Sequence, residues 1–254
     1  MAHHNLKKES KDILLFGRHP IELALKNPRR TILELFYTKD ALSGLTLPPT
    51  IKAKCVDRPF LDSLVGRDTI HQGLVARVLP LTQPTLDEVL KKLKDKETAL
   101  IMILDQITDP HNVGAILRSA VAFDADAVLV PEAGAPVEAG TLAKSASGAL
   151  ELIPFIRVSN LIRAMEKLKQ ADFWCIGLDG YAKDSIAGAK LPKRCAFVMG
   201  SEGDGMRRLT QENCDYSVKL PMNPVIESLN VSNAAALTLY EFRRQHPATG
   251  EADS

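Results

Sequence analysis

The chain has 254 residues, of which 45% are hydrophobic and 25% are charged, and its formal net charge is +1. This composition is typical of a globular protein with one large domain or two modest ones. The near-neutral charge does not indicate a nucleic-acid partner, so any such partner would have to bind local basic patches. No apolar run approaches membrane-spanning length and the amino terminus lacks the apolar core of a signal peptide, which predicts a cytoplasmic protein without a membrane segment.

The cysteines and histidines are scattered along the chain. There is no C-x-x-C pair and the six histidines do not cluster, which argues against a zinc site and against a disulfide framework. We therefore expect no metal, and reduced thiols as in cytoplasmic proteins. The four cysteines are Cys55, Cys175, Cys195 and Cys214.

A small α/β unit is expected over residues 12–79, after a polar tail over residues 1–11. Runs rich in β-branched and aromatic residues predict its strands. The His19-Pro20 pair predicts a helix start, because proline is favoured in the first helical turn. The expected elements are strands over 13–17, 31–38 and 73–79 and helices from residue 19 and over 59–65.

Residues 80–97 connect this unit to the rest of the chain. The run Pro80-Leu81-Thr82-Gln83-Pro84-Thr85 has the composition of a linker. Leucine and valine side chains then recur on one face over residues 86–96, which predicts an amphipathic helix.

Strands and helices alternate over residues 98–247, ahead of a short tail over 248–254. The alternation is typical of a parallel sheet covered by helices, in which ligands bind at the carboxyl ends of the strands. The expected strands are 99–104, 127–130, 153–158, 173–178, 196–199 and 216–220, and the expected helices are 113–123, 137–146, 161–170, 205–213 and 231–244.

The loop after the strand at 99–104 carries more polar residues than a connection needs. It leads into a helix on which Gly114 and Arg118 share one face, a turn apart. One interpretation is that a phosphate or sugar lies on the bare surface at Gly114, held by Arg118 and the helix N-terminus. The alternative is structural, with Asn112 as the N-cap, Gly114 accommodating packing and Arg118 a surface cation.

A glycine-rich loop from Gly200 to Gly205 follows the strand expected over 196–199. Its glycines allow a ligand to approach the backbone closely, but the loop has neither the G-x-G-x-x-G spacing nor the lysine of a P-loop. A nucleotide-like ligand is therefore plausible, whereas ATP-type phosphate binding is not supported. The alternative is an ordinary turn in which Asp204 caps the following helix, although Glu202 would then have no packing role.

The loop over residues 220–233 combines two prolines with several Ser and Asn residues before a helix. Only one of these polar residues can be the N-cap, and we expect Asn230 or Ser232. The interleaved Val225 and Ile226 predict a loop that folds back onto the protein. The alternative is a helix start that is simply well capped.

These three loops resemble the three motifs of the SpoU family, which are S-adenosylmethionine-dependent RNA ribose 2′-O-methyltransferases of the SPOUT superfamily. All three occur in order, and their concordance is far more specific than any one motif. The matching segments are Asn112-x-Gly114-x-x-x-Arg118, Phe197-Val198-Met199-Gly200-x-Glu202-Gly203, and Leu220-Pro221-Met222 through Ser228-Leu229-Asn230-Val231-Ser232.

Further segments resemble the branch of this family that methylates a guanosine in large-subunit (23S) ribosomal RNA. They are Gly17-x-His19-Pro20, Ile70-His71-Gln72-Gly73, Thr108-Asp109-Pro110-His111-Asn112 and Gly205-Met206-Arg207-Arg208-Leu209. The resemblance implies a ribosomal-protein-like RNA-binding fold in the N-terminal domain. It also implies a deep trefoil knot in the C-terminal domain, which general fold rules treat as a rare exception, and a homodimer with its site near the subunit interface.

The resemblance assigns site residues position by position. The chain departs from it over residues 223–227, where relatives tend to be smaller and less charged. The implied binding residues for S-adenosylmethionine are Met199, Gly200, Leu220, Leu229 and Asn230. The implied catalytic and substrate residues are Asn112, Arg118, Glu202, Ser228 and Asn230.

The implied reaction is in-line attack of a ribose 2′-oxygen on the sulfonium methyl, which requires a proton acceptor or a field that stabilises the alkoxide. Arginine stays protonated in proteins. We therefore expect Arg118 to pair with the adjacent phosphate and stabilise the alkoxide, while Glu202 or water receives the proton. Asn112 and Ser228 would orient Arg118 or the ribose.

Basic residues elsewhere are expected to contact RNA phosphates without raising the net charge. They are Arg18, His19, Arg29, Arg30, Arg207 and Arg208.

Two other functions remain open. One is the same chemistry on transfer RNA, although the extra domain before Pro80 favours ribosomal RNA. The other is an RNA-binding or ribosome-assembly factor without catalysis, against which the intact Arg118, Glu202 and Asn230 argue.

Overall fold

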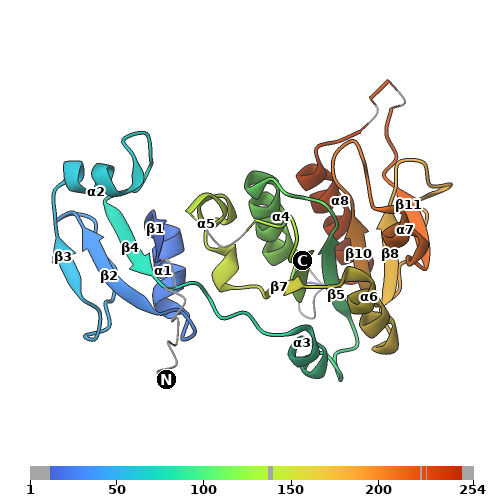
Figure 1. The fold of residues 1–254 in the computed structure, drawn as a ribbon, viewed down its shortest axis with the longest axis horizontal. Helices are drawn as coiled ribbons and strands as arrows, with labels where there is room; N and C mark the ends of the chain where they lie inside the picture. The colour runs from blue at the N-terminus through green and yellow to red at the C-terminus, as the bar shows by residue number, and fades with distance from the viewer. Residues whose placement is uncertain (1–11, 137–139, 224, 227, 248–254) are drawn as a thin grey trace, which may run out of the picture.

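The computed structural model describes residues 12–136, 140–223, 225–226 and 228–247. Figure 1 shows a small N-terminal sheet with its helices beside a larger α/β part, joined by an extended segment that leads into helix α3. The tails expected over 1–11 and 248–254 lie outside the described residues.

The N-terminal part is a four-stranded sheet in the order β1-β4-β2-β3. Strand β4 pairs antiparallel with both β1 and β2, while β3 pairs parallel with β2. Strand β3 was not predicted, because its three residues are all exposed and lack an alternating pattern. The elements are β1 (Ile13–Phe16), α1 (Arg18–Lys26), β2 (Ile32–Tyr37), β3 (Ala53–Cys55), α2 (Arg58–Val65) and β4 (Leu74–Val78).

The connecting helix α3 (Leu86–Lys92) begins at a capping box. The Thr85 side chain accepts a hydrogen bond from the Glu88 N–H, and the Glu88 carboxylate accepts one from the Thr85 N–H at 2.7 Å. This reciprocal arrangement satisfies N–H groups that a helix start leaves without partners.

The larger part is a seven-stranded sheet in the order β7-β6-β5-β10-β8-β11-β9. Every neighbouring pair is parallel, which confirms the predicted parallel sheet. Its strands are β5 (Ala99–Leu104), β6 (Ala127–Pro131), β7 (Phe155–Val158), β8 (Trp174–Leu178), β9 (Asp184–Ser185), β10 (Arg194–Met199) and β11 (Tyr216–Lys219). Its helices are α4 (Pro110–Ala122), α5 (Gly140–Ala146), the 3-10 turn η1 (Ala149–Glu151), α6 (Leu161–Gln170), α7 (Arg208–Glu212) and α8 (Val231–Gln245).

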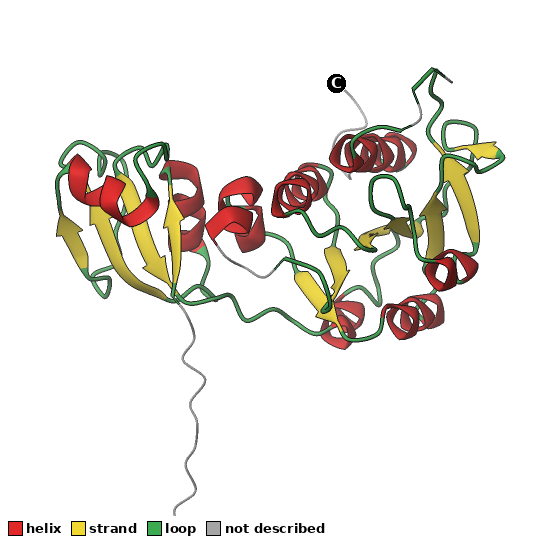
Figure 2. Cartoon of the chain, turned by 45° about the horizontal axis from the view of Figure 1, so that its top comes forward, coloured by secondary structure: helices red, strands yellow, loops and turns green. Residues whose placement is uncertain are grey.

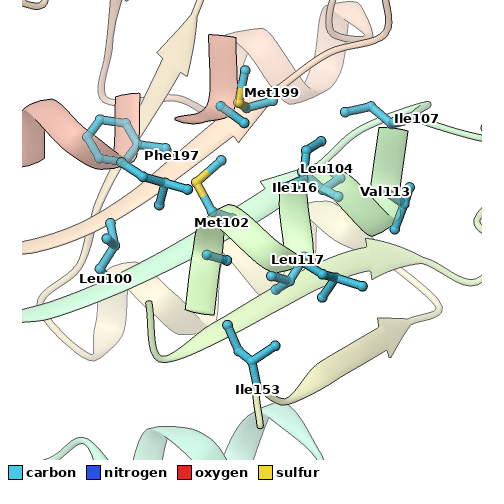
Figure 3. Close-up of a cluster of buried hydrophobic side chains, with 14 of the residues drawn as sticks. Leu100, Met102, Leu104, Ile107, Val113, Ile116, Leu117, Ile153, Phe197 and Met199 are labelled. Carbon is cyan, nitrogen blue, oxygen red and sulfur yellow. The ribbon is translucent and has the colours of Figure 1, made fainter. Parts of the chain in front are cut away.

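Strand β5 supplies both layers of the core, because successive side chains of a strand point to opposite faces. Leu100, Met102 and Leu104 join a cluster with α4 and α8, which Figure 3 shows in close-up. Ala99, Ile101 and Ile103 join the cluster on the opposite face, with α3 and α6. Burial on both faces explains why this strand is an unbroken apolar run.

Three predicted helices differ clearly from the structure at their starts, and the first is α4, which was expected from residue 113 but begins at Pro110. The helix expected over 205–213 begins at Arg208, because residues 201–205 form a tight turn closed by two backbone hydrogen bonds between Ser201 and Gly205. Of the helix expected over 137–146, residues 137–139 lie outside the described part and α5 spans Gly140–Ala146.

Helix α5 lies between the two parts of the molecule and contacts both β1 and α4 (Figures 1 and 2). Its Ala143 is buried in the N-terminal core. Just after it, Glu151 bonds Arg30 of the N-terminal part, with its Oε1 accepting from Nε at 2.8 Å and from Nη2 at 2.6 Å. The N-terminal part is therefore held by a buried ion pair as well as by the linker.

Candidate active site

Helix α4 starts the site at the carboxyl end of β5. Asp109 is its N-cap and accepts a hydrogen bond from the His111 N–H at 2.9 Å, with Pro110 in the first turn. The alternative that made Asn112 the cap is therefore wrong. Because Asp109 caps the helix, the Asn112 side chain is free to reach a neighbouring loop.

Asn112 is joined to the last loop by Asn230. The Asn230 Nδ2 donates to Asn112 Oδ1 at 3.0 Å, across 118 positions of sequence. The Asn230 Oδ1 accepts from the N–H of Ser232 at 3.0 Å and from its hydroxyl at 2.6 Å. Asn230, one of the two expected caps, is the N-cap of α8, and it links the first and third loops through the other end of its amide.

Gly114 does not face an open ligand surface. It is buried, and a Cβ built on it would lie 2.4 Å from Ser145 Cβ and 2.7 Å from the Ala146 nitrogen. The bare surface at Gly114 is therefore filled by α5, and the packing interpretation is confirmed. Only a glycine lets the two helices approach this closely.

Arg118 differs from Gly114 in its surroundings. Its side chain is exposed and, within the described part of the chain, forms no hydrogen bond or ion pair. A guanidinium without a protein partner is available to bind a phosphate in a bidentate way.

The second loop is shaped by a close crossing of its own backbone. A Cβ on Gly200 would lie 2.0 Å from the Gly205 carbonyl carbon. Between them Gly203 has a φ of 92°, which favours glycine. Glu202 is exposed in this turn, and the N-cap of α7 is Arg207 and not the expected Asp204.

A buried carboxylate that the sequence analysis missed anchors the second loop to the first. Asp105 has 0% exposure and accepts from the Arg207 N–H at 2.9 Å and from its Nε at 2.8 Å. Its position directly after the apolar strand β5 was the available signal, since ligand-side polar groups follow parallel strands. The ion pair gives Arg207 a structural role, and its contact with RNA stays a prediction.

The third loop is more exposed than predicted. Val225 is 82% exposed and Ile226 is 56% exposed, so the expectation that they fold back onto the protein is wrong. Leu220 and Leu229 are half-buried at either end of the loop, and Ser228 is exposed. The apolar side chains of this loop that pack partly against the protein are therefore its two leucines. Pro224 and Glu227 lie outside the described residues.

Met199 completes the predicted cofactor set, but its side chain is buried in the core (Figure 3). Its carbonyl accepts a hydrogen bond from the Asp105 N–H at 2.7 Å. Met199 would therefore shape the site through its backbone.

The predicted RNA-binding residues fall into two groups. His19, Arg29 and Arg208 are exposed, and Arg18 is half-buried. The Arg30 side chain has 0% exposure, since it pairs with Glu151 and donates to the Leu79 carbonyl at 2.7 Å. The expectation that Arg30 contacts RNA is therefore wrong, because its charge is used between the two parts of the protein.

The motif at residues 17–20 and the motif at residues 70–73 lie side by side in the N-terminal part. The Arg18 N–H donates to Gln72 Oε1 at 2.9 Å. In the same motif His71 is buried, and its Nδ1 accepts from the Gly73 N–H at 3.1 Å. The proton is then on Nε2, which donates to Asp62 at 3.0 Å. The sequence motif thus stabilises the loop that adjoins Gly17 and Arg18.

Two cysteines in the core, one buried and one half-buried, do not offer a reactive thiol to the site. Burial raises the pKa of Cys175 and of Cys214 to about 12, so these thiols are protonated at neutral pH and are poor nucleophiles. In the described ranges, no group of three or more His, Cys, Asp or Glu side chains is placed to hold a metal ion. Among the helices described, none is long and apolar enough to cross a membrane.

The chain resembles known proteins over nearly its full length. It is 38% identical over 239 residues to the 23S rRNA (guanosine-2′-O-)-methyltransferase RlmB of Photobacterium profundum, covering 91% of this chain and 97% of the relative. It is 36% identical over 239 residues to the protein of that name from Escherichia coli K12, with 91% and 98% covered.

The solved SpoU methyltransferase AviRb from Streptomyces viridochromogenes, in complex with the cofactor AdoMet, shares the fold. The TM-score is 0.77 at 24% identity, and the match covers 92% of this chain and 90% of that one. Residues 14–84 match the family described as RNA 2′-O ribose methyltransferase substrate binding, and residues 99–240 match the SpoU rRNA Methylase family. The resemblance expected from the three loops is confirmed, and the chain belongs to the SpoU rRNA methylase family.

Proposed function

We propose that this protein transfers a methyl group from S-adenosylmethionine to the 2′-hydroxyl of a guanosine ribose in 23S ribosomal RNA. The observation that carries the proposal is the joining of three strand-end loops by hydrogen bonds, next to a helix that carries an unpaired arginine. Asn112 is bonded to Asn230 and Asp105 to Arg207, while Arg118, on the same helix α4 as Asn112, is exposed. The 23S guanosine enzymes to which the chain is 36–38% identical supply the substrate.

The second and third loops suit the cofactor. Leu220 and Leu229 are half-buried apolar side chains that would cover an adenine ring. Built Cβ atoms on Gly203 and Gly205 meet nothing within 4 Å, so a ligand can approach this backbone. Gly200 shapes the turn, and we assign these residues, with Asn230 and the Met199 backbone, to holding the cofactor, which supplies a methyl activated by a positive sulfonium.

The protein's own groups would bind and deprotonate the ribose. Arg118 pairs with the phosphate next to the target ribose and stabilises the developing alkoxide. Asn112 has its Oδ1 occupied by Asn230, so its Nδ2 is the group left to orient the ribose or Arg118, together with Ser228. Glu202, exposed in its turn, or a water beside it, receives the proton.

The role of Glu202 is tested by Glu202→Gln. If Glu202 accepts the proton, the acidic limb of the pH–rate profile disappears in this variant and the rate falls about 100-fold, as is typical of general-base removal. Glu212→Gln, an exposed carboxylate on α7, is the matched control. An unchanged profile in Glu202→Gln assigns proton transfer to water.

We further propose the homodimer and the trefoil knot of the family. On α8, Leu237 is 47% exposed and Tyr240 is 53% exposed, while Leu239 and Phe242 are buried, so one face of the helix has apolar surface for a second copy. After β11 the chain returns across β8 and β10 to pack α8 against α4, which is compatible with a threaded chain. We place the protein in the cytoplasm, with its ribosomal RNA substrate.

The deciding experiment is methyl transfer from labelled S-adenosylmethionine to separated ribosomal and transfer RNAs, followed by mapping of the modified nucleotide. Label on one guanosine of 23S RNA is the expected result. Label on transfer RNA alone supports the transfer-RNA alternative. Absence of S-adenosylmethionine binding in calorimetry would instead support a non-catalytic assembly factor.

A further inference from the structure

A cavity of about 470 Å³ lies between the two parts of the molecule. Strand β1 and the end of α2 line one side, and α5 and the first turn of α4 line the other. Its volume is within the range of about 300–1,000 Å³ that suits small ligands. The chemistry described above uses Asn112 and Arg118 of α4 and leaves this cavity unexplained.

One half of the cavity is apolar and includes an aromatic ring. Leu14, Phe16, Leu64 and Val65 line it, and all four are only half-buried. The Lys144 Nζ lies 5.8 Å from the centre of the Phe16 ring, near the outer limit of a cation–π contact. A planar aromatic ligand can replace that weak contact by stacking on Phe16.

The other half is polar and positively charged. Lys144 and Thr141 are exposed on α5, and the His111 Nδ1 is 3.1 Å from the Ser145 hydroxyl. The described residues that line the cavity include this lysine and no carboxylate. A flat apolar floor with a cation beside it complements an unstacked nucleobase and its phosphate.

The position of the cavity connects it with the reacting ribose. His111 lines the cavity and the next residue, Asn112, is bonded to Asn230 in the site. On the N-terminal side the rim adjoins the two neighbouring sequence motifs, where Ile70 is 81% exposed. The cavity is therefore within one residue of a side chain, Asn112, that the proposed function assigns to the ribose site.

We propose that the cavity binds an unstacked base from a nucleotide next to the methylated one, with the base on Phe16 and its phosphate on Lys144. This inference rests on the proposed function and gives the joint between the two parts a direct role in RNA recognition. Helix α5 then carries a nucleotide contact on the face that adjoins the N-terminal sheet.

The test uses full-length protein and in-vitro transcribed fragments of 23S ribosomal RNA, taking forward the fragment that binds most tightly. Phe16→Leu keeps apolar volume but removes the stacking face, and we expect about tenfold weaker binding with an unchanged salt dependence. Lys144→Met keeps the stem but removes the charge. It should weaken binding and lower the slope of log Kd against log salt by about one. Lys91→Met on α3 is the matched control and should change neither quantity.

A second measurement locates the base directly. 4-Thiouridine placed in the same RNA should cross-link to peptides that contain Phe16 or Lys144. Wild-type RNA affinity in both variants, or cross-links confined to other surfaces, overturns the inference. Failure of the proposed function is read separately, as absent methyl transfer by the wild-type protein, and S-adenosylmethionine affinity should be equal in all variants.

Discussion

Two charged regions of the molecule, the Arg30–Glu151 pair and Arg118 on α4, differ in how their charges are satisfied. Between the two parts of the molecule, the side chains of Arg30 and Glu151 have 0% and 2% exposure and bond each other. On α4, Arg118 is exposed and has no partner among the described residues. A buried charge needs a protein partner because desolvation is costly, whereas an exposed arginine without one is available to a ligand. Burial and partners, more than residue type, separate the structural Arg30 from Arg118, the arginine that we propose binds RNA.

The first prediction concerns the buried carboxylate that partners Arg30. Glu151→Ala leaves Arg30 buried without its carboxylate, and we expect a loss of about 3–5 kcal/mol in the free energy of unfolding. Urea unfolding followed by near-UV circular dichroism and fluorescence measures the loss. The matched control is Glu212→Ala, whose exposed pair with Arg208 should be worth less than about 1 kcal/mol. Equal losses in the two variants would contradict the assignment.

The second prediction concerns the unpaired arginine. Arg118→Lys keeps the charge but loses the planar fork, and we expect kcat/KM for methyl transfer to fall about 100-fold, with a larger loss for Arg118→Ala. The melting temperature should not change, because the side chain is exposed. Arg163→Lys on α6, also exposed, is the control. Near-normal turnover in Arg118→Lys would count against bidentate phosphate binding.

The third prediction tests the close contact that joins the two regions. In Gly114→Ala the new Cβ meets Ser145 at 2.4 Å, so α5 must shift, at an expected cost of about 1–3 kcal/mol in stability. Thermal unfolding measures this cost, and RNA affinity should fall as α5 moves. At Gly180 a built Cβ meets nothing within 4 Å, and Gly180→Ala should stay within about 0.5 kcal/mol of the wild type. A Gly114→Ala variant as stable as the wild type would show that α5 is not held by this contact.

The smallest expected effect concerns the core on the face of the sheet opposite α4. With a pKa of about 12, the thiols of Cys175 and Cys214 are protonated at pH 8, while Cys55 is exposed. Cys195 is buried like Cys175, so brief treatment with iodoacetamide should give a single adduct, at Cys55, in mass spectrometry of the native protein. Modification of Cys214 as fast as that of Cys55 would show that the core opens near the second loop.

The regular elements could be read from local pattern, and the exceptions have physical causes. The unbroken apolar run of β5 and the alternation after it predicted a parallel sheet, which the structure confirms. Strand β3 was missed because its side chains are exposed. The start of α7 was misplaced because residues 201–205 form a turn that helical periodicity does not reveal.

The candidate site was also predicted in part, with its motifs found and its long-range partners missed. The three loops and their polar residues were visible as sequence motifs, and Asn230 was among the expected caps. Asp105 was missed, and Arg30 was assigned to RNA, because a carboxylate or a guanidinium in a sequence does not show which partner it will meet. The Arg30–Glu151 pair spans 121 positions and the Asp105–Arg207 pair spans 102.

The sequence by itself determined the family, the order of the elements and the loops that carry chemistry, because these depend on residue type and on spacing along the chain. The tertiary structure decided which of those residues are used for packing and which stay exposed without a protein partner. Gly114 packs against α5, Arg30 forms a buried ion pair with Glu151, and Arg118 stays exposed without a protein partner. Sequence alone could not show this, because burial and partners arise only when distant segments meet. The cavity at Phe16 and Lys144 is likewise a product of docking, since its two sides come from different parts of the chain.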